Sequence, residues 1–211
     1  MENYIEQHEY RGFNINIHHD DQAGNPRQEF DGMGHMVCFH SKYDLGDKHE
    51  FDSAEDLMEY LNEVHAEWLP LHLYDHSGIT MNTSGFSCPW DSGQVGVIYM
   101  TIEEIEDEYP LKNYPDQIER ARKYMTGEVK EYDDYLTGSV YGYTIEPKDE
   151  NKGIECGDSC WGYYGYDSIS YMVDEAKGNI NYAIKEYKAQ VIVERDRKRE
   201  INKFMRSCWA Y

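Results

Sequence analysis

Apolar residues change their spacing several times along this chain, and this feature most constrains the fold. In GFNINIH (residues 12–18) Phe13, Ile15 and Ile17 alternate with polar residues, which is the period of a half-buried strand. Leu57, Leu61 and Val64 instead recur at the spacing of one helix face. Repeated switching between the two periods predicts an α+β fold, with a mainly antiparallel sheet packed by helices.

Apolar spacing, turn residues and helix caps predict the remaining helices and strands. Apolar runs bounded by turn residues predict further strands at 35–40, 71–75, 79–83, 94–100, 139–146 and 158–166. Residues 70–100 are predicted to form a hairpin, with its turn at His76-Ser77-Gly78, and a third strand of the same sheet. Helices are predicted from a Ser53 cap to about Trp68, over a short stretch after Thr101 with Glu104 placed for a capping box, and from Pro115 to about Leu136. A last helix begins near Ser168 and extends into a basic tail.

Charge divides the chain into two parts. Residues 185–206 hold eight Lys or Arg and four acids, while the whole chain carries −21, so the first 184 residues carry −25. We therefore predict one acidic α+β domain over residues 1–184 and a basic helical extension over 185–211. A body this acidic repels nucleic acid and membranes and attracts basic surfaces.

The cysteines and the N-terminal residues indicate the cellular compartment of the protein. Five cysteines, an odd number without a CxxC pair, indicate reduced thiols. The start MENYIEQHEY is not a signal peptide, and no apolar stretch of about 18 residues occurs. These features predict a cytoplasmic protein that does not enter membranes.

The stretch YDHSGITMNTSGFSCPWDSGQVG (74–96) has two interpretations. As an active site, Cys88, His76 and Asp91 would be nucleophile, base and orienting group of a cysteine- or metal-dependent hydrolase. As scaffold, Asp75-x-Ser77-Gly78 and Asp91-Ser92-Gly93 are turn chemistry. Phe86, Pro89 and Trp90 would then anchor the loop, with Cys88 and Cys160 reduced and largely buried. The scaffold interpretation is favoured, because no convergent catalytic roles are apparent.

Motifs for cofactors and metals are missing from the sequence. It contains no GxSxG, HExxH, P-loop or paired-cysteine motif, and GMGHMV (32–37) lacks the third glycine of a dinucleotide fingerprint. No spacing rule selects a metal site among His35, His40, Asp44, Asp47 and His49. We predict neither a cofactor nor a metal.

Several motifs occur in a fixed order over about residues 30–170: MVCFHSKYDLGDKHEF, YDHSG, FSCPWDSGQVG, YDDYLTGSVYGY and DSCWGYYGYD. They resemble motifs of a family of small acidic proteins from phages and other mobile elements of Gram-positive bacteria. The resemblance transfers no catalytic role to any residue. It implies a bacterial host cell, and an accessory protein that acts against host defence or host regulation.

Acidic residues fall into three clusters. Glu55, Glu59, Glu63 and Glu67 are spaced at i, i+4, and no Lys or Arg occurs between Lys48 and Lys112. Four helical residues rise about 6 Å, within a factor of two of the phosphate rise of about 3.4 Å along one DNA strand. The second cluster is Glu103, Glu104, Glu106, Asp107 and Glu108, and the third is Glu128, Glu131, Asp133 and Asp134.

The acidic clusters and the phage resemblance together predict a non-enzymatic inhibitor or decoy that mimics nucleic acid. Its partner would be the basic groove of a host nucleic-acid-handling protein, such as a CRISPR effector or a restriction enzyme. The first two clusters would bear the contact, and the acidic body would not bind nucleic acid itself. Two alternatives stay open: the hydrolase described above, and a protein that sequesters a signalling nucleotide. The oligomeric state is left undetermined.

Overall fold

A computed structural model describes residues 4–110, 114–156 and 159–208 and divides the chain into two compact units. The terminal unit comprises residues 1–20 and 141–211, and the central unit comprises residues 21–140. Each unit contains one four-stranded sheet with helices, so the α+β class is confirmed. The boundary expected at residue 184 does not coincide with this division, because it falls inside one long helix, α5 (Ile169–Cys208).

The sheet of the terminal unit has the strand order β1-β2-β7-β8. Its strands are β1 (Glu6–Tyr10), β2 (Phe13–His19), β7 (Val140–Pro147) and β8 (Ser159–Tyr164). β2 and β7 are antiparallel neighbours, with His19 opposite Tyr141, so the central unit is inserted between two strands that pair. Short 3₁₀ turns lie at Asp149–Asn151 and Tyr166–Ser168.

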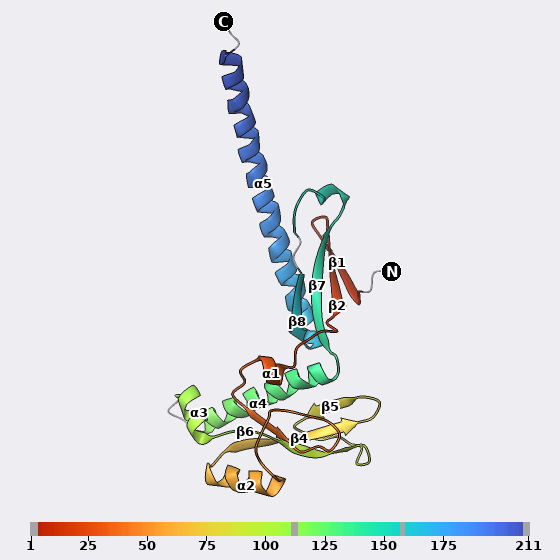
Figure 1. The fold of residues 1–211 in the computed structure, drawn as a ribbon, viewed down its shortest axis with the longest axis vertical. Helices are drawn as coiled ribbons and strands as arrows, with labels where there is room; N and C mark the ends of the chain where they lie inside the picture. The colour runs from red at the N-terminus through yellow and green to blue at the C-terminus, as the bar shows by residue number, and fades with distance from the viewer. Residues whose placement is uncertain (1–3, 111–113, 157–158, 209–211) are drawn as a thin grey trace. The chain divides into compact units, whose positions relative to one another are not determined.

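The core of the terminal unit lies between this sheet and α5. Phe13, Ile15 and Ile17 are fully buried, as their alternation predicts. The buried residues of α5 in this core share one face of the helix: Ile169, Met172, Val173, Ala176, Ile180 and Ile184. Figure 1 shows α5 continuing past the end of the sheet as one uninterrupted helix.

Strand β1 was not predicted from the sequence. Its residues EQHEY are half-buried or exposed, because it is an edge strand without an apolar face. It joins β2 through Arg11 and Gly12, both at positive φ (50° and 81°). Two positive φ values match the tight hairpin turn whose twist fits two antiparallel strands.

The sheet of the central unit has the order β3-β6-β4-β5. Its strands are β3 (His35–Cys38), β6 (Ser92–Met100), β4 (Glu67–Asp75) and β5 (Ile79–Asn82). β4 and β5 form the hairpin predicted around His76-Ser77-Gly78, and β6 pairs with β4. The prediction that residues 70–100 form a hairpin and a third strand of one sheet is confirmed.

Helices cover both faces of the central sheet, as Figure 1 shows for α2 (Ala54–Glu63) and α4 (Tyr114–Leu136). Successive residues of β6 alternate between them. Val97 and Tyr99 pack with Leu57 and Leu61 of α2. Ile98 and Met100 pack in the cluster that includes the α4 residues Ala121, Met125 and Val129. Two short helices, α1 (Pro26–Glu29) and α3 (Ile102–Glu108), complete the unit, and the Thr101–Glu104 capping box of α3 is confirmed.

The predicted end of α2 near Trp68 was wrong, because the helix ends at Glu63. His65 takes a left-handed conformation (φ 51°), and the N–H of Ala66 closes back on the carbonyl of Leu61. The chain then enters β4 at Glu67, paired with Met100. Pro70 is tolerated in this strand because β5 pairs only with His72 onward, so no donor is required on that side.

Candidate functional site

The exposed face of α2 is acidic because its apolar residues face the sheet. Leu57 and Leu61 are buried, which leaves Glu55, Glu59 and Glu63 exposed on the opposite side. A hollow of about 560 Å³ lies along this helix. Four of its lining residues are acidic and three are aromatic: Glu50, Asp56, Glu59 and Glu63, with Phe51, Tyr60 and Tyr99.

A second hollow, of about 340 Å³, is linked to the first by one aromatic contact. It is lined by Gly32, Met33, His35, Met100, Glu104, Asp107 and Glu108. The ring of His35 lies 5.0 Å from the ring of Tyr99, which lines the first hollow. Nε2 of His35 lies 2.7 Å from Oε1 of Glu104, so the α3 carboxylate reaches the same side of the sheet as α2.

Electrostatics in this region follow from burial and hydrogen bonding. Burial acts to raise the pKa of Glu104, but hydrogen bonds from His35 and Thr101 outweigh it, so this pKa lies below its ordinary value. Burial, with the neighbouring Tyr60 and Glu104, raises the pKa of Tyr99 to about 12. Glu104 is therefore held ionised at neutral pH, and Tyr99 is held neutral.

The carboxylates around the two hollows form what we call the acidic surface: Glu50, Asp56, Glu59, Glu63, Glu104, Asp107 and Glu108. Among the residues that the structure describes, no Lys or Arg lines either hollow. His35 is the one described lining residue that can carry positive charge. Such a surface is suited to receive cationic side chains.

Sequence reasoning selected some of these residues and missed others. Glu55, Glu103 and Glu106 are exposed on α2 and α3, but they do not line the hollows. Tyr60 and Tyr99 were missed, and His35 was considered only as a metal ligand. Only the pairing of β3 with β6 brings His35 opposite Tyr99. The i, i+4 spacing of Glu59 and Glu63, with Asp56 beside them, was a sufficient signal for the α2 part.

Glu67 was wrongly placed on the helix ridge. It belongs to β4, and its carboxylate is neutralised by Arg122 of α4. The Nε and Nη2 atoms of Arg122 lie 2.7 Å and 2.6 Å from Oε1 of Glu67. A carboxylate already paired with a guanidinium has less to offer a basic partner, so Glu67 leaves the proposed contact.

The side chains of the third predicted cluster are engaged in contacts within the central unit. Glu128 is buried and accepts a hydrogen bond from the N–H of Gly34, and its Oε2 lies 3.4 Å from Nη1 of Arg27. Asp133 accepts hydrogen bonds from the hydroxyl of Thr80 and the N–H of Met81. Asp134 pairs with Lys130 one turn away, and Glu131 is half-buried. Glu128 and Asp133 thus connect α4 to other parts of the central unit.

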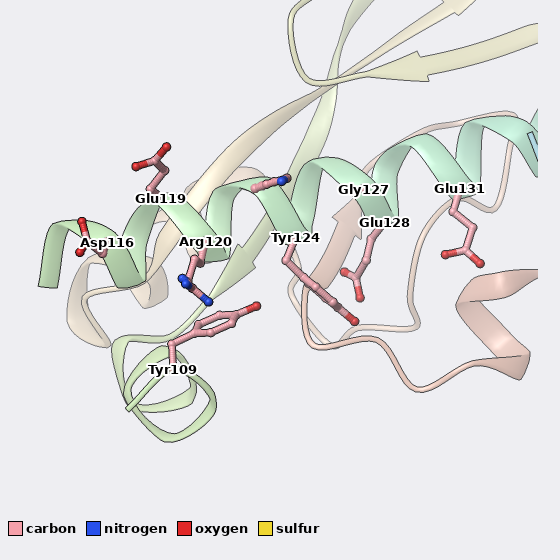
Figure 2. Close-up of a pocket in the computed structure, with 9 residues that line it drawn as sticks. Tyr109, Asp116, Glu119, Arg120, Tyr124, Gly127, Glu128 and Glu131 are labelled. Atoms are coloured by element: carbon pink, nitrogen blue, oxygen red, sulfur yellow. The ribbon is translucent and has the colours of Figure 1, made fainter. Parts of the chain in front are cut away.

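A larger hollow, of about 1030 Å³, runs along α4 (Figure 2). Figure 2 shows Arg120, Tyr124 and Glu128 projecting from this helix, with Tyr109 facing them. Burial raises the pKa of Glu128, and burial together with Glu128 raises that of Tyr124. Its lining mixes Arg120 and Lys123 with four carboxylates, so it presents no single charge to a partner.

The candidate catalytic residues do meet, but in an order that does not suit nucleophilic catalysis. Sγ of Cys88 and Nδ1 of His76 lie 3.6 Å and 3.4 Å from the same Oδ2 of Asp91. An activated thiol requires the imidazole between thiol and carboxylate, whereas here the carboxylate lies between the other two. Asp91 also accepts the N–H of Asp75 at its carbonyl, which suits the scaffold interpretation.

Part of the predicted anchoring of this loop was wrong. Trp90 is 92% exposed and Pro89 is exposed, because both follow the chain as it rounds the tip before β6. Phe86 is half-buried, with its ring 5.6 Å from that of Tyr74. Cys88 and Cys160 are free thiols as predicted, but they are half-buried rather than largely buried.

Other candidate ligands serve separate structural contacts. His40 accepts the N–H groups of Lys42 and Tyr43, Asp47 binds Arg27, and His49 contacts the carbonyl of Cys38. Within the described ranges, no three His, Cys, Asp or Glu side chains gather as metal ligands would. In the same part of the chain, no helix has both the length and the apolar character needed to cross a bilayer.

Comparison with known proteins gives no relative: no family model, no curated protein and no solved structure matches this chain. The resemblance to acidic phage proteins therefore stays a prediction. Functional inference rests on the chemistry of the acidic surface.

Proposed function

We propose that this protein is a non-enzymatic inhibitor that binds the basic nucleic-acid groove of a host protein, such as a CRISPR effector or a restriction enzyme. The observation that carries the proposal is the acidic surface, where seven carboxylates line two hollows linked by the His35–Tyr99 contact, with no Lys or Arg among the described residues of the linings. Its setting is the bacterial cytoplasm.

The hollows fit the side chains that line nucleic-acid grooves. A Lys or Arg entering the α2 hollow would place its charged group among Asp56, Glu59 and Glu63. Its aliphatic stem or guanidinium plane would lie against the rings of Tyr60 and Tyr99. Several cations engaged in this way would release counterions from the host groove, as nucleic acid does.

The local cost of these charges supports the proposal. Glu55, Glu59 and Glu63 lie at i, i+4 positions of α2 without an intervening cation. Each like-charge pair destabilises a helix by roughly 0.2–0.5 kcal/mol. A helix needed only for solubility would gain stability from alternating signs, so the uniform sign is better explained by a binding role.

The test compares two variants of equal charge. One carries Asp56→Asn, Glu59→Gln and Glu63→Gln in the acidic surface. The other carries Asp149→Asn, Glu155→Gln and Asp174→Asn, three exposed acids of the terminal unit. Each protein is titrated into DNA-cleavage reactions of purified CRISPR effectors and restriction enzymes from the bacterial host. We expect wild type and the terminal-unit variant to inhibit equally, and the α2 variant to lose at least about tenfold in potency.

Salt provides the second arm of the test. Inhibition by charge mimicry weakens steeply as salt rises, because counterions compete for the groove. Equal potency of the two variants, or inhibition that is insensitive to salt, would contradict the proposal. A melting curve for each variant shows that the fold is retained.

A further inference from the structure

Within the terminal unit, the described residues leave the second half of α5 largely uncovered. Residues up to Ile184 pack on the sheet of the terminal unit. From Lys185 to Cys208, every side chain that the structure describes is exposed. Figure 1 shows this half of the helix projecting past the sheet. Packing of an apolar face supplies most of the stability of helices in proteins, so a long bare helix is expected to have a partner.

The core-facing stripe of α5 continues along the bare half. Beyond Ile180 and Ile184, the same face carries six residues at alternating spacings of four and three: Tyr187, Val191, Glu194, Lys198, Ile201 and Met205. This is the spacing of a coiled-coil seam. The four apolar members are exposed by 40%, 45%, 52% and 48% in chain order. The stripe is thus continuous with an apolar interface that is already formed on the sheet.

The residues of the seam are complementary to those of a second, identical helix that runs in the opposite direction. The six positions are symmetric about Asp196. The two central positions carry opposite charges, because Glu194 and Lys198 lie at equal distances on either side of Asp196. Reversal also places Val191 opposite Ile201 and Tyr187 opposite Met205. Within one helix Glu194 and Lys198 already form an ion pair of 2.7 Å, so both side chains lie along the same line.

We propose that a second copy of this chain covers the seam, with the two α5 helices antiparallel and centred on Asp196. Glu194 of each copy then faces Lys198 of the other, and apolar residues face apolar residues on both sides. The contact is isologous and closes as a twofold dimer. It is independent of the proposed inhibitor function, because it uses the terminal unit alone.

The chemistry of the seam disfavours other arrangements. Parallel helices in register would place Glu194 against Glu194 and Lys198 against Lys198, with like charges in the seam. A nucleic acid or another acidic partner would bind the cations, but of the eight Lys and Arg in residues 185–206 only Lys198 lies in the seam, so such a partner would leave the apolar residues of the stripe bare. Neither arrangement pairs Glu194 of one helix with Lys198 of another.

The same register shows why the dimer is expected to dissociate readily. The overlap from Tyr187 to Met205 is about 27 Å of helix, which is short for a stable interface. Arg195 and Arg197 flank the seam near the twofold axis, where they approach the same residues of the second copy. This repulsion is long-range and is screened by salt.

Sedimentation of the full chain over a range of concentrations tests the proposal. We expect a monomer–dimer equilibrium that Lys198→Glu weakens by about tenfold, since it creates two Glu–Glu contacts in each dimer. The matched control is Lys203→Glu, which changes the net charge equally off the seam and should not weaken the dimer. Mixing Lys198→Glu with Glu194→Lys should restore association, because all central contacts then have opposite signs.

Orientation is tested by cross-linking in a Cys208→Ser background. Glu194→Cys and Lys198→Cys proteins are mixed and oxidised, and disulfides should form mainly between the two different variants. Preferential cross-linking of each variant to itself would overturn the antiparallel register. A monomer at every concentration, or equal dimerisation of wild type and Lys198→Glu, would overturn the dimer. A dimer lost in about 1 M salt would instead show the basic helix docked on the acidic surface of a second copy, which also overturns the proposal.

Discussion

Arg27 is a side chain on which much of the central unit depends. Its Nε and Nη2 atoms lie 2.8 Å and 2.6 Å from the two oxygens of Asp47, and Nη2 also donates to the carbonyl of Gly34. Its Nη1 faces Glu128, and both side chains are more than nine-tenths buried. Because α1, the residue before β3, the Asp47 loop and α4 meet at this one guanidinium, its loss affects several parts of the unit at once.

Replacing Arg27 with Met should therefore be strongly destabilising. The substitution leaves Glu128 buried without its cation, which costs about 3–5 kcal/mol of unfolding free energy. Urea unfolding measures the change, and the double variant Arg27→Met/Glu128→Gln is the control. The double variant should recover part of the loss, since the uncompensated charge is gone, and additive losses would contradict this account.

Burial of Glu128 also predicts a pH dependence. Its folded-state pKa lies above its unfolded value, so the folded state binds the proton more tightly. The contribution of this group to stability therefore increases as pH falls through the folded pKa toward about 4.5. In unfolding measured at several pH values, wild type should gain stability relative to Glu128→Gln over this interval. A constant difference would show that Glu128 titrates normally.

Cys88 provides a test of the scaffold interpretation at the scale of one atom. Its sulfur is half-buried and contacts a carboxylate rather than an imidazole. In native protein, a thiol reagent should label the exposed Cys208 well before Cys88. Labelling of Cys88 first would bring the hydrolase interpretation back.

Among the elements, α2 shows where sequence reasoning succeeds and where it stops. The period of Leu57, Leu61 and Val64 predicted the helix and its buried face. Trp68 fits the same period, so the pattern alone extends the helix too far. Pairing of Trp68 with Tyr99 across β4 and β6 decides the boundary, and this long-range contact leaves no local signal. The same limit applies to the partnership of Tyr99 with His35 in the acidic surface.

Strand β2 and the β4–β5 hairpin were predictable for a different reason. Their apolar alternation and their turn residues are both local, so the sequence of each segment is sufficient to predict its secondary structure. Strand β1 has only one of these two local signals, the turn. Its sequence shows a turn at Arg11-Gly12 but no apolar face, since its neighbour on one side is solvent.

The end of α2 predicts a stabilising substitution. His65 is held at positive φ, a conformation that costs a residue with a Cβ roughly 1 kcal/mol and costs glycine little. His65→Gly should therefore raise the unfolding free energy by up to about 1 kcal/mol, as measured by urea denaturation. His65→Ala keeps the strain and serves as control; equal effects of the two would show that φ is not the cause.

Neutralising the centre of the α2 acids should separate stability from binding. Glu59→Gln removes two i, i+4 repulsions, with Glu55 and with Glu63, and should stabilise the protein by roughly 0.4–1 kcal/mol. The proposed function predicts that the same variant inhibits a host target less well than wild type. Thermal melting and the cleavage assay measure the two effects on one sample, and a less stable variant would contradict the repulsion argument.

At the scale of the whole molecule, the central unit is an insertion whose two ends meet. His19 at the end of β2 lies opposite Tyr141 at the start of β7. We expect a chain in which a short turn replaces residues 21–139 to fold as the terminal unit, because little loop-closure entropy is needed. Circular dichroism and sedimentation of this chain would show a folded protein that still dimerises, and an unfolded product would make the two units interdependent.

The paired ends of the insertion also determine how the molecule responds to force. When an unfolding motor pulls on the two termini, tension passes from β2 to β7 through the hydrogen bonds that join them. While those bonds hold, the central unit is a slack loop outside the load-bearing path. The terminal unit therefore unfolds before the central unit bears any load, and the acidic surface keeps its shape until the β2–β7 hydrogen bonds have been broken.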